Sequence, residues 1–344
     1  RLKIRNAFAV RQRRLHDRAI VPNSPAYFAM GIIMRAFIFP GQGSQAVGMG
    51  KALAEASSTA REVFEEVDHA LEQNLFKLMC EGPSEELTLT ENAQPAIMAN
   101  AIATLRVMEK DGGKSLEDLC SYVAGHSLGE YSALCAAGAL NLTTTAELLK
   151  LRGLSMQKAV PVGKGGMAAL LGADIKKASA LANESAQGEI CTVANDNDPT
   201  QVVISGHIGA IERAIAAAKE HGIKRGILLP VSAPFHCSLM APAAEAMEEA
   251  LGEATILSPV VPVFANVTAA PVSEVDEIRD LLVRQVTGTV RWRESVANMA
   301  ESGVEQFVEF GGKVLSGMVG RIAPDAETVS LVSLDDIESF LKGL

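Results

Sequence analysis

The sequence predicts an α/β fold in which a mainly parallel sheet carries an inserted β-α-β-β-α-β subdomain. Two short apolar strands, at 35–39 and 121–124, alternate with amphipathic helices, and helical crossovers of this kind join parallel strands. Strands that are apolar along their whole length suit a sheet covered by helices on both faces. In the block 162–232, strands and helices follow the ferredoxin-like order. We therefore expect a large domain made of 34–161 and 233–344, and a small subdomain at 162–232.

The elements expected of the large domain begin with the strand at 35–39, which ends at a Pro-Gly loop. Helices are expected at 59–72, 94–110, 128–138 and 143–159. The second of these helices follows a Gln-Pro step, which suits a helix N-terminus. Helices and strands after the subdomain are expected at 238–251, 261–265, 276–287, 292–302, 305–309 and 313–321. Those inside the subdomain are expected at 167–171, 174–186, 189–194, 201–205, 207–221 and 225–229.

Residues 1–33 differ from the rest of the chain in their charge. They hold seven Lys or Arg and one Asp, a balance of +6, so the remainder carries −16 of the total charge of −10. We expect a leader or an expression-derived segment without order, although an Arg-rich, acid-poor stretch also suits a targeting peptide. The acidic remainder argues against a nucleic-acid binder.

The cysteines and the apolar residues predict a compartment. The chain has five cysteines, scattered and without a C-x-x-C pair, so we expect reduced thiols and a cytoplasmic protein. No apolar run approaches the roughly 18 residues that a membrane span needs. No His/Cys/Asp cluster has metal-ligand spacing. We therefore expect no membrane association and no metal.

The most informative stretch is the turn Gly125-His126-Ser127-Leu128-Gly129, which matches the G-x-S-x-G nucleophile elbow of hydrolase-like sheets. Such a turn holds the serine backbone in a strained conformation, and the two glycines relieve the crowding because they lack a Cβ. The Ser127 hydroxyl should stand clear of the sheet. The Leu128 amide should lie at a helix N-terminus, where it can bind an oxyanion. The alternative is an ordinary glycine-rich turn.

A serine hydroxyl becomes a nucleophile when a base takes its proton, and histidine is the usual base. Of the six histidines, His236 is the best candidate, because it lies in an extended, apolar segment at the subdomain junction. From the residues alone, a packed structural histidine is an equal alternative. No acid stands at an obvious strand end between Ser127 and His236, since we expect Asp174 to open a helix and Asp196 and Asp198 to lie in a turn.

Four motifs in order support a family resemblance. They are the loop Phe39-Pro-Gly-Gln-Gly-Ser-Gln45, the elbow followed by Glu130-Tyr131, the segment Leu151-Arg-Gly153 with Met156-Gln157, and the His236 segment. Together they resemble the malonyl-CoA:acyl-carrier-protein transacylases of bacterial fatty-acid synthesis, from about Met34 to the C-terminus. The resemblance implies transfer of a malonyl group from malonyl-CoA to the phosphopantetheine thiol of acyl carrier protein. It implies a ping-pong mechanism through a malonyl-serine, with no cofactor beyond the thioester substrate.

The resemblance also implies roles for individual residues. Ser127 corresponds to the malonylated nucleophile and His236 to its base. The main-chain carbonyl of Gln285 corresponds to the group that orients the imidazole. The family thus uses a Ser–His dyad in place of a triad.

Three further residues correspond to the groups that hold the substrate. Gln42 and the Leu128 amide correspond to the oxyanion hole, and Arg152 to the residue that pairs with the free malonyl carboxylate. A guanidinium binds a carboxylate through two parallel hydrogen bonds, and a buried one rejects neutral acyl groups. Without the resemblance, Arg152 would be taken as a helix-surface residue, and Gln42 as a loop side chain bonded to its own turn.

Two other functions stay open at this point: a thioesterase or esterase on a similar sheet, and a non-catalytic scaffold that binds carrier protein. We expect a monomer with acyl carrier protein and malonyl-CoA as partners. Because the carrier proteins of this pathway are acidic, docking needs a local basic patch. The candidates for it are Lys224, Arg225, Arg284, Arg291, Arg293, Lys313 and Arg321.

Overall fold

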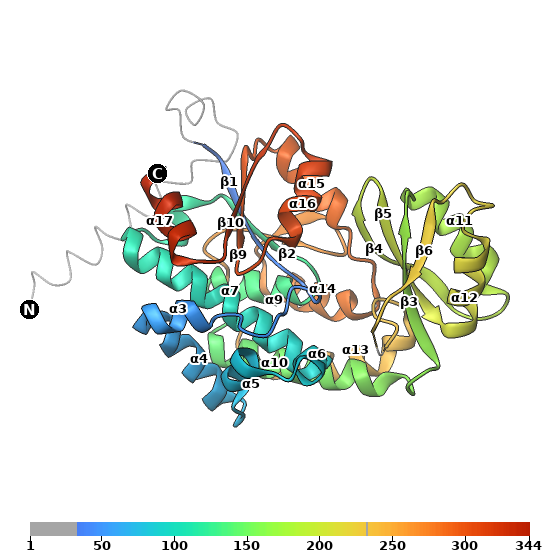
Figure 1. The fold of residues 1–344 in the computed structure, drawn as a ribbon, viewed down its shortest axis with the longest axis horizontal. Helices are drawn as coiled ribbons and strands as arrows, with labels where there is room; N and C mark the ends of the chain where they lie inside the picture. The colour runs from blue at the N-terminus through green and yellow to red at the C-terminus, as the bar shows by residue number, and fades with distance from the viewer. Residues whose placement is uncertain (1–32, 232) are drawn as a thin grey trace, which may run out of the picture.

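The computed structural model describes residues 33–231 and 233–344, which form two sheets side by side (Figure 1). Apart from Ile33, the segment expected to be a leader lies outside the described residues. The larger sheet has six strands and the smaller has four. This architecture confirms the predicted fold class.

The large sheet is parallel except at one edge. Its strand order is β10-β9-β1-β2-β7-β8, and only β8 runs antiparallel to its neighbour. The strands are β1 (Arg35–Phe39), β2 (Tyr122–Gly125), β7 (Val263–Ala265), β8 (Ala270–Val272), β9 (Gln306–Phe310) and β10 (Glu327–Leu331). The sequence analysis missed β8 and β10, which are the two edge strands. The central strands β1 and β2 end beside each other, and the elbow follows β2.

Helices cover both faces of the large sheet (Figure 1). Those before the small sheet are α3 (Lys51–Ala56), α4 (Ser58–Ala70), α5 (Leu75–Glu81), α6 (Ser84–Thr88), α7 (Thr90–Gly112), α8 (Leu116–Leu119), α9 (Leu128–Ala136) and α10 (Leu142–Ala159). Those after it are η1 (Ser238–Met240), α13 (Ala241–Glu253), α14 (Val275–Thr287), α15 (Trp292–Glu301), α16 (Val314–Ile322) and α17 (Leu334–Lys342). No helix in the described part of the chain could cross a bilayer.

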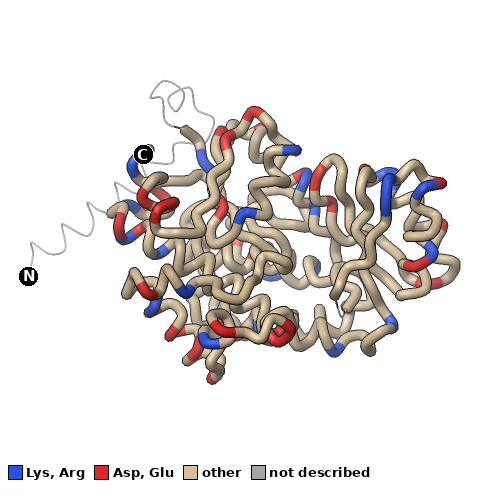
Figure 2. The backbone as a smooth tube through the Cα atoms, viewed as in Figure 1, with Lys and Arg blue, Asp and Glu red and all other residues tan. Residues whose placement is uncertain are grey.

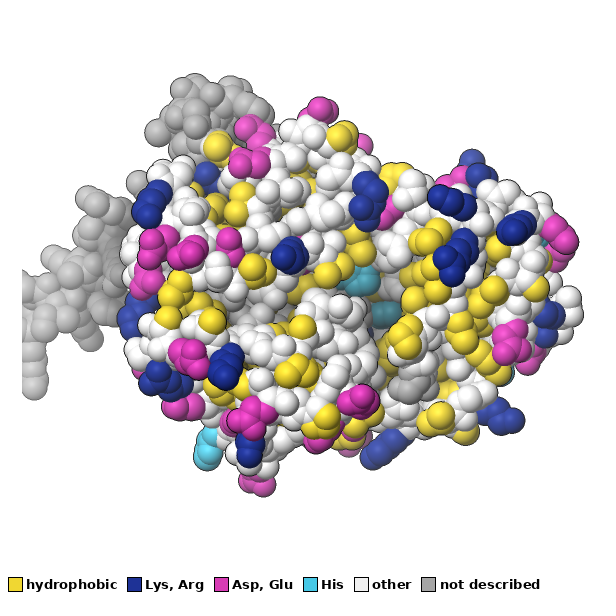
Figure 3. Space-filling view, viewed as in Figure 1, with side chains coloured by type: hydrophobic (Ala, Val, Ile, Leu, Met, Phe, Trp, Pro, Cys, Tyr) yellow, Lys and Arg dark blue, Asp and Glu magenta, His cyan; other side chains and the backbone are white. Residues whose placement is uncertain are grey.

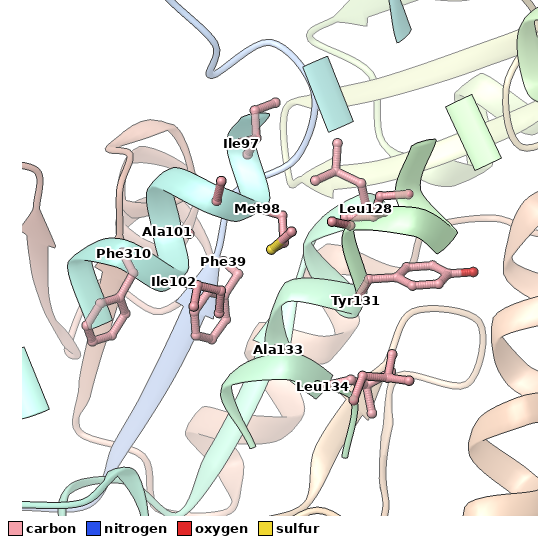
Figure 4. Packing of buried hydrophobic residues seen from close by; sticks show 14 of the residues in the cluster. Phe39, Ile97, Met98, Ala101, Ile102, Leu128, Tyr131, Ala133, Leu134 and Phe310 are labelled. Atoms are coloured by element: carbon pink, nitrogen blue, oxygen red, sulfur yellow. The ribbon is translucent and has the colours of Figure 1, made fainter. Parts of the chain in front are cut away.

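Helix α7 is the centre of the main core. Ile97, Met98 and Ile102 of α7 lie beside α9 and the strand side chains (Figure 4). The expected start of this helix was wrong, because it begins at Thr90 and places Pro95 in its interior. Burial of nearly the whole helix outweighs the hydrogen bond that a proline forfeits.

The small sheet has the predicted order of elements. These are β3 (Gly165–Leu171), α11 (Ile175–Ala186), β4 (Cys191–Asp198), β5 (Gln201–His207), α12 (Ile208–Ala217) and β6 (Arg225–Leu228). The strand order is β4-β5-β3-β6, with every pair antiparallel. Both helices pack on one face of this sheet through an apolar cluster. The opposite face is therefore free to contact the large domain.

Strand β4 joins the small sheet to the large domain. The Asp196 amide donates to the Val290 carbonyl at 2.9 Å, and the Val290 amide donates to the Ala194 carbonyl at 2.9 Å. Asp196 and Asp198 were expected to lie in a turn. This expectation was wrong, because both belong to β4. Both are buried, because Arg293 and Arg321 each pair with one of them at 2.8 Å. The two arginines form ion pairs with these carboxylates, which explains why a stretch of sequence typical of a loop can form a buried strand.

Candidate active site

Ser127 stands on a strained turn between β2 and α9. Its backbone has φ 54° and ψ −110°, a region that non-glycine residues rarely adopt. A Cβ at Gly125 would lie 1.9 Å from the carbonyl carbon of Gly129, and a Cβ at Gly129 would lie 2.2 Å from the carbonyl oxygen of Phe39. Both glycines are therefore required by the close approach of backbone to backbone, as the elbow motif predicts.

The Ser127 hydroxyl contacts the imidazole of His236. The distance between Ser127 Oγ and His236 Nε2 is 2.8 Å, and that between His236 Nδ1 and the Gln285 carbonyl oxygen is 2.9 Å. A carbonyl oxygen only accepts, so Nδ1 carries the proton of the neutral ring. Nε2 is then the acceptor that faces the hydroxyl. This is the geometry that a general base needs.

Arg152 is fully buried beside this pair. Its Nη1 donates to Gln94 Oε1 at 2.8 Å, and its Nη2 donates to Gln285 Oε1 at 2.8 Å and to Ser127 Oγ at 3.1 Å. It is 1% exposed, and no carboxylate of the described residues lies within ion-pair distance of it. A buried cation held only by neutral groups is suited to bind an anion. The expectation of a helix-surface residue is thereby excluded.

The neighbourhood keeps His236 neutral. Burial, and then the positive charge of Arg152, lowers the pKa of His236 to about 3. His126, next to the nucleophile, is also buried, and burial lowers its pKa. The His126 side chain turns away from Ser127, since its Nε2 lies 2.8 Å from Asn197 Oδ1. His236 is thus the imidazole that contacts the hydroxyl, and it is neutral, so its Nε2 lone pair is free to accept.

These groups line a pocket of about 260 Å³ between the two sheets. Figure 3 shows a hollow there, with histidine side chains in it and hydrophobic side chains around it. Five of the six residues singled out in the sequence line it, namely Gln42, Ser127, Leu128, Arg152 and His236. Gln285 lies behind them. Apolar lining comes from Met156, Met167, Leu229, Val231 and Phe235.

Two polar groups of the lining are available to a ligand. Leu128 is the first residue of α9, so its amide has no partner within the helix. Among the described residues, the Gln42 side chain has a single long polar contact, from its Nε2 to Thr90 Oγ1 at 3.5 Å, which is beyond usual hydrogen-bond length. No group of His, Cys, Asp and Glu in the described ranges could hold a metal ion.

The sequence analysis assigned no role to three polar residues of the site. Asn266 accepts from the Ser127 amide at 2.8 Å and donates to the Gly125 carbonyl at 2.7 Å. Glu130 is buried behind the elbow, and Gln94 holds Arg152. Asn266 follows β7 directly, and side chains at the carboxyl ends of parallel strands commonly form sites, so its position was a usable signal.

Most residues of the predicted basic patch form ion pairs with neighbouring carboxylates. Of the seven candidates, Arg284, Arg291, Arg293 and Arg321 form ion pairs with Asp280, Glu294, Asp196 and Asp198. The other three are exposed, with no ion pair among the described residues: Lys224, Arg225 and Lys313. Figure 2 shows Lys and Arg interspersed with Asp and Glu over the outer elements.

One family model and several known proteins resemble this chain. The model of the acyl transferase domain matches residues 36–313. A malonyl CoA-acyl carrier protein transacylase of Salmonella typhimurium is 45% identical over 299 residues, 87% of this chain and 95% of the relative. An acyl-carrier-protein S-malonyltransferase structure from Bartonella henselae has a TM-score of 0.88 and 50% identity, and the match covers 90% of this chain and 99% of that one. A malonyl-transacylase solved with its type II PKS acyl-carrier protein has a TM-score of 0.87 at 40% identity, over 90% of this chain and 100% of that one.

Proposed function

Because the chain belongs to the malonyl-CoA:acyl carrier protein transacylase family, we propose that Ser127 and His236 carry out the family's reaction in it. The enzyme is an acyl-carrier-protein S-malonyltransferase, which transfers a malonyl group from malonyl-CoA to acyl carrier protein in fatty-acid synthesis. The observation that carries the residue assignment is the 2.8 Å contact between Ser127 Oγ and His236 Nε2, beside a buried Arg152.

In the first half-reaction, His236 Nε2 takes the Ser127 proton while Oγ attacks the thioester carbonyl of malonyl-CoA. The carbonyl oxygen becomes an oxyanion, which the Leu128 amide and the Gln42 side chain stabilise. Collapse of this intermediate breaks the carbon–sulfur bond. The imidazolium returns its proton to the departing sulfur, so free CoA leaves and the malonyl group stays on Ser127.

Arg152 selects the acyl group. The malonyl carboxylate remains ionised after thioester formation and pairs with the guanidinium, which has no carboxylate of the described residues within ion-pair distance. A neutral acyl group leaves that buried charge unpaired. The 1% exposure of Arg152 supports this role, because burial strengthens both the pairing and the penalty.

In the second half-reaction, the phosphopantetheine thiol of acyl carrier protein attacks the malonyl-serine, and His236 accepts the thiol proton. The same imidazolium then protonates Ser127 Oγ as the ester bond breaks. The related malonyl-transacylase solved in complex with an acyl-carrier protein supports the partner. Among the candidate cations, the unpaired Lys224, Arg225 and Lys313 are the best suited to meet an acidic carrier.

Intact-mass analysis of Ser127→Ala with labelled malonyl-CoA tests the assignment. We expect the wild-type protein to gain one malonyl group and Ser127→Ala to gain none. Ser132→Ala is the matched control, because Ser132 lies nearby in α9, is buried, and has no hydrogen-bond partner for its hydroxyl among the described residues. Label on Ser127→Ala at the wild-type level would overturn the proposal. Loss of the wild-type adduct to water before carrier protein is added would instead indicate a thioesterase.

The remaining assignments are also proposals. We infer that residues 34–161 with 233–344, and residues 162–232, act as the two structural units, because the pocket lies between their sheets. A reducing, cytoplasmic location is consistent with the five free thiols. That the protein is a monomer stays a prediction, which size-exclusion chromatography would test.

A further inference from the structure

A buried carboxylate, Glu130, lies behind the elbow and is not used in the reaction described above. It belongs to α9, three residues after Ser127, and is 2% exposed. No cation of the described residues lies within ion-pair distance of it. Its Oε2 accepts from the Asn266 amide at 3.0 Å and from Gln285 Nε2 at 2.7 Å. A carboxylate is rarely buried without a paired cation, so the two hydrogen bonds that Glu130 accepts are the contacts that hold it in place.

The side-chain amide of Gln285 connects this carboxylate to Arg152. Gln285 Nε2 donates to Glu130, while Gln285 Oε1 accepts from Arg152 Nη2 at 2.8 Å. Only one orientation of the amide is compatible with these partners, since a carboxylate accepts and a guanidinium donates. The amide dipole therefore lies with its positive end at the anion and its negative end at the cation.

Gln285 also contacts both members of the dyad. Its main-chain carbonyl orients His236 at 2.9 Å, and its Nε2 donates to the Ser127 carbonyl at 2.9 Å. Glu130 thereby anchors a residue on which the base, the nucleophile and the carboxylate-binding arginine all depend. Through the Asn266 amide it also holds the side chain that fixes the Ser127 backbone.

We propose that Glu130 is a positioning residue that, through the Gln285 amide, aims Arg152 at the acyl carboxylate and provides the negative charge that balances Arg152 when no malonyl group is bound. The proposal rests on the function proposed above. In the empty site, Arg152 interacts with Glu130 across the amide. A bound malonyl group adds a second carboxylate, which competes with Glu130 for the same positive charge.

This competition makes acyl preference depend on pH. Burial raises the pKa of Glu130 to about 7, against the lowering effects of Gln285, Asn266 and Arg152. The other titratable group that interacts with it is Tyr131, which burial keeps protonated. Protonation of Glu130 frees Arg152 for malonate. Preference for malonyl over acetyl groups should therefore rise as pH falls from 8 to 6, by about tenfold for each pKa unit by which a bound carboxylate would raise the pKa of Glu130.

The test compares kcat/KM for malonyl-CoA and acetyl-CoA in wild type, Glu130→Ala and Glu130→Gln, across pH 6 to 8. The ratio cancels the titration of His236, which serves both substrates. We expect Glu130→Ala to lower the malonyl preference by about tenfold or more, because the guanidinium loses its anchor. Glu130→Gln keeps an acceptor oxygen but carries no charge, so its malonyl preference should match that of the wild type at pH 6 and should not depend on pH.

Glu309→Gln is the matched control. Glu309 is an equally buried carboxylate, but it accepts from the first amides of α16, away from the pocket. Its replacement should change thermal stability without changing the ratio. An unchanged preference in Glu130→Ala would overturn the proposal, even if both rates fall. Should that variant not fold, a ratio in Glu130→Gln that keeps the wild-type pH dependence would overturn it. Malonylation of wild-type Ser127, measured by mass in the same samples, separates this failure from failure of the proposed function.

Discussion

Arg152 Nη2 donates a hydrogen bond to Ser127 Oγ at 3.1 Å, so the residue proposed to bind the substrate carboxylate touches the nucleophile in the free protein. The same oxygen lies 2.8 Å from His236 Nε2. A cation at this distance favours the developing alkoxide and disfavours a protonated imidazole. Recognition of the acyl group and activation of the serine are thus combined in one cluster.

Replacement of Arg152 should remove acyl selectivity. In Arg152→Ala we expect kcat/KM for malonyl-CoA to fall about a hundred- to a thousand-fold, because truncating one partner of a buried charged pair costs about 2–5 kcal/mol. The rate with acetyl-CoA should fall much less. Lys150→Ala is the control, since Lys150 lies on the same helix but contacts Gln73 and Asn92. An unchanged ratio of the two substrates in Arg152→Ala would exclude Arg152 from carboxylate binding.

The acylation rate should begin to fall on the acid side, the acid limb of its pH profile, at a pH far below the ordinary pKa of histidine. His236 must be neutral to act as a base, and its pKa is lowered to about 3, so acylation by acetyl-CoA should stay constant from pH 7 down to about 5. Arg152→Ala removes one of the two main causes of the shift, and its acid limb should move upward. Because the unfolded chain binds this proton more readily than the folded one, stability should also fall as pH drops below 6.5. An acid limb near 6.5 in the wild-type protein would contradict this prediction.

The elbow should not tolerate a methyl group at Gly129. In Gly129→Ala the new Cβ would meet the Phe39 carbonyl oxygen at 2.2 Å, and we expect a loss of about 2–4 kcal/mol in the free energy of unfolding. Gly320→Ala is the matched control. It lies in α16 with no atom within 4 Å of the new Cβ, so it should stabilise the protein by about 1 kcal/mol. Denaturant unfolding of both variants measures the difference, and equal midpoints would show that the elbow can relax.

The ion pair between Arg293 and Asp196 should stabilise the junction of the two sheets. Arg293→Met leaves the buried Asp196 carboxylate without its cation, which should cost about 3 kcal/mol. Arg284→Met provides the comparison, because Asp280 is exposed and such pairs contribute about 0.5 kcal/mol or less. Asp196→Asn in the Arg293→Met background should recover part of the loss. Equal unfolding midpoints for the two single variants would argue against a role at the junction.

The sequence was sufficient for the elements whose signals are local. The elbow, the strand before it and the order of the small sheet follow from short patterns of apolar residues and glycines. The edge strand β10 was missed because Glu327, Thr328 and Ser330 leave it only Val329 and Leu331 as apolar residues, which is too short an alternation to indicate a strand. Helix α17 was also missed, although its sequence carried a usable signal. Ser333 and Asp336 form a capping box at its start.

The buried polar residues that support the site and the sheet junction could not be predicted from local sequence patterns. Glu130 accepts hydrogen bonds from residues 136 and 155 positions away, and no local pattern specifies such partners. Asp196 and Asp198 looked like turn residues because the cations that neutralise them lie 97 and 123 positions away. Buried polar residues are placed by tertiary contacts, and only the fold as a whole shows what satisfies them.

The left-handed backbone at Ser127 also restricts how the enzyme can evolve. Threonine is the other aliphatic alcohol among the amino acids, yet its branched Cβ makes a φ of 54° far less accessible. Replacing serine by threonine adds one methyl group, which is a small change elsewhere in the chain. At position 127 the added methyl group would disfavour the backbone conformation that the elbow needs. The identity of the attacking group is thus constrained by conformation as well as by chemistry.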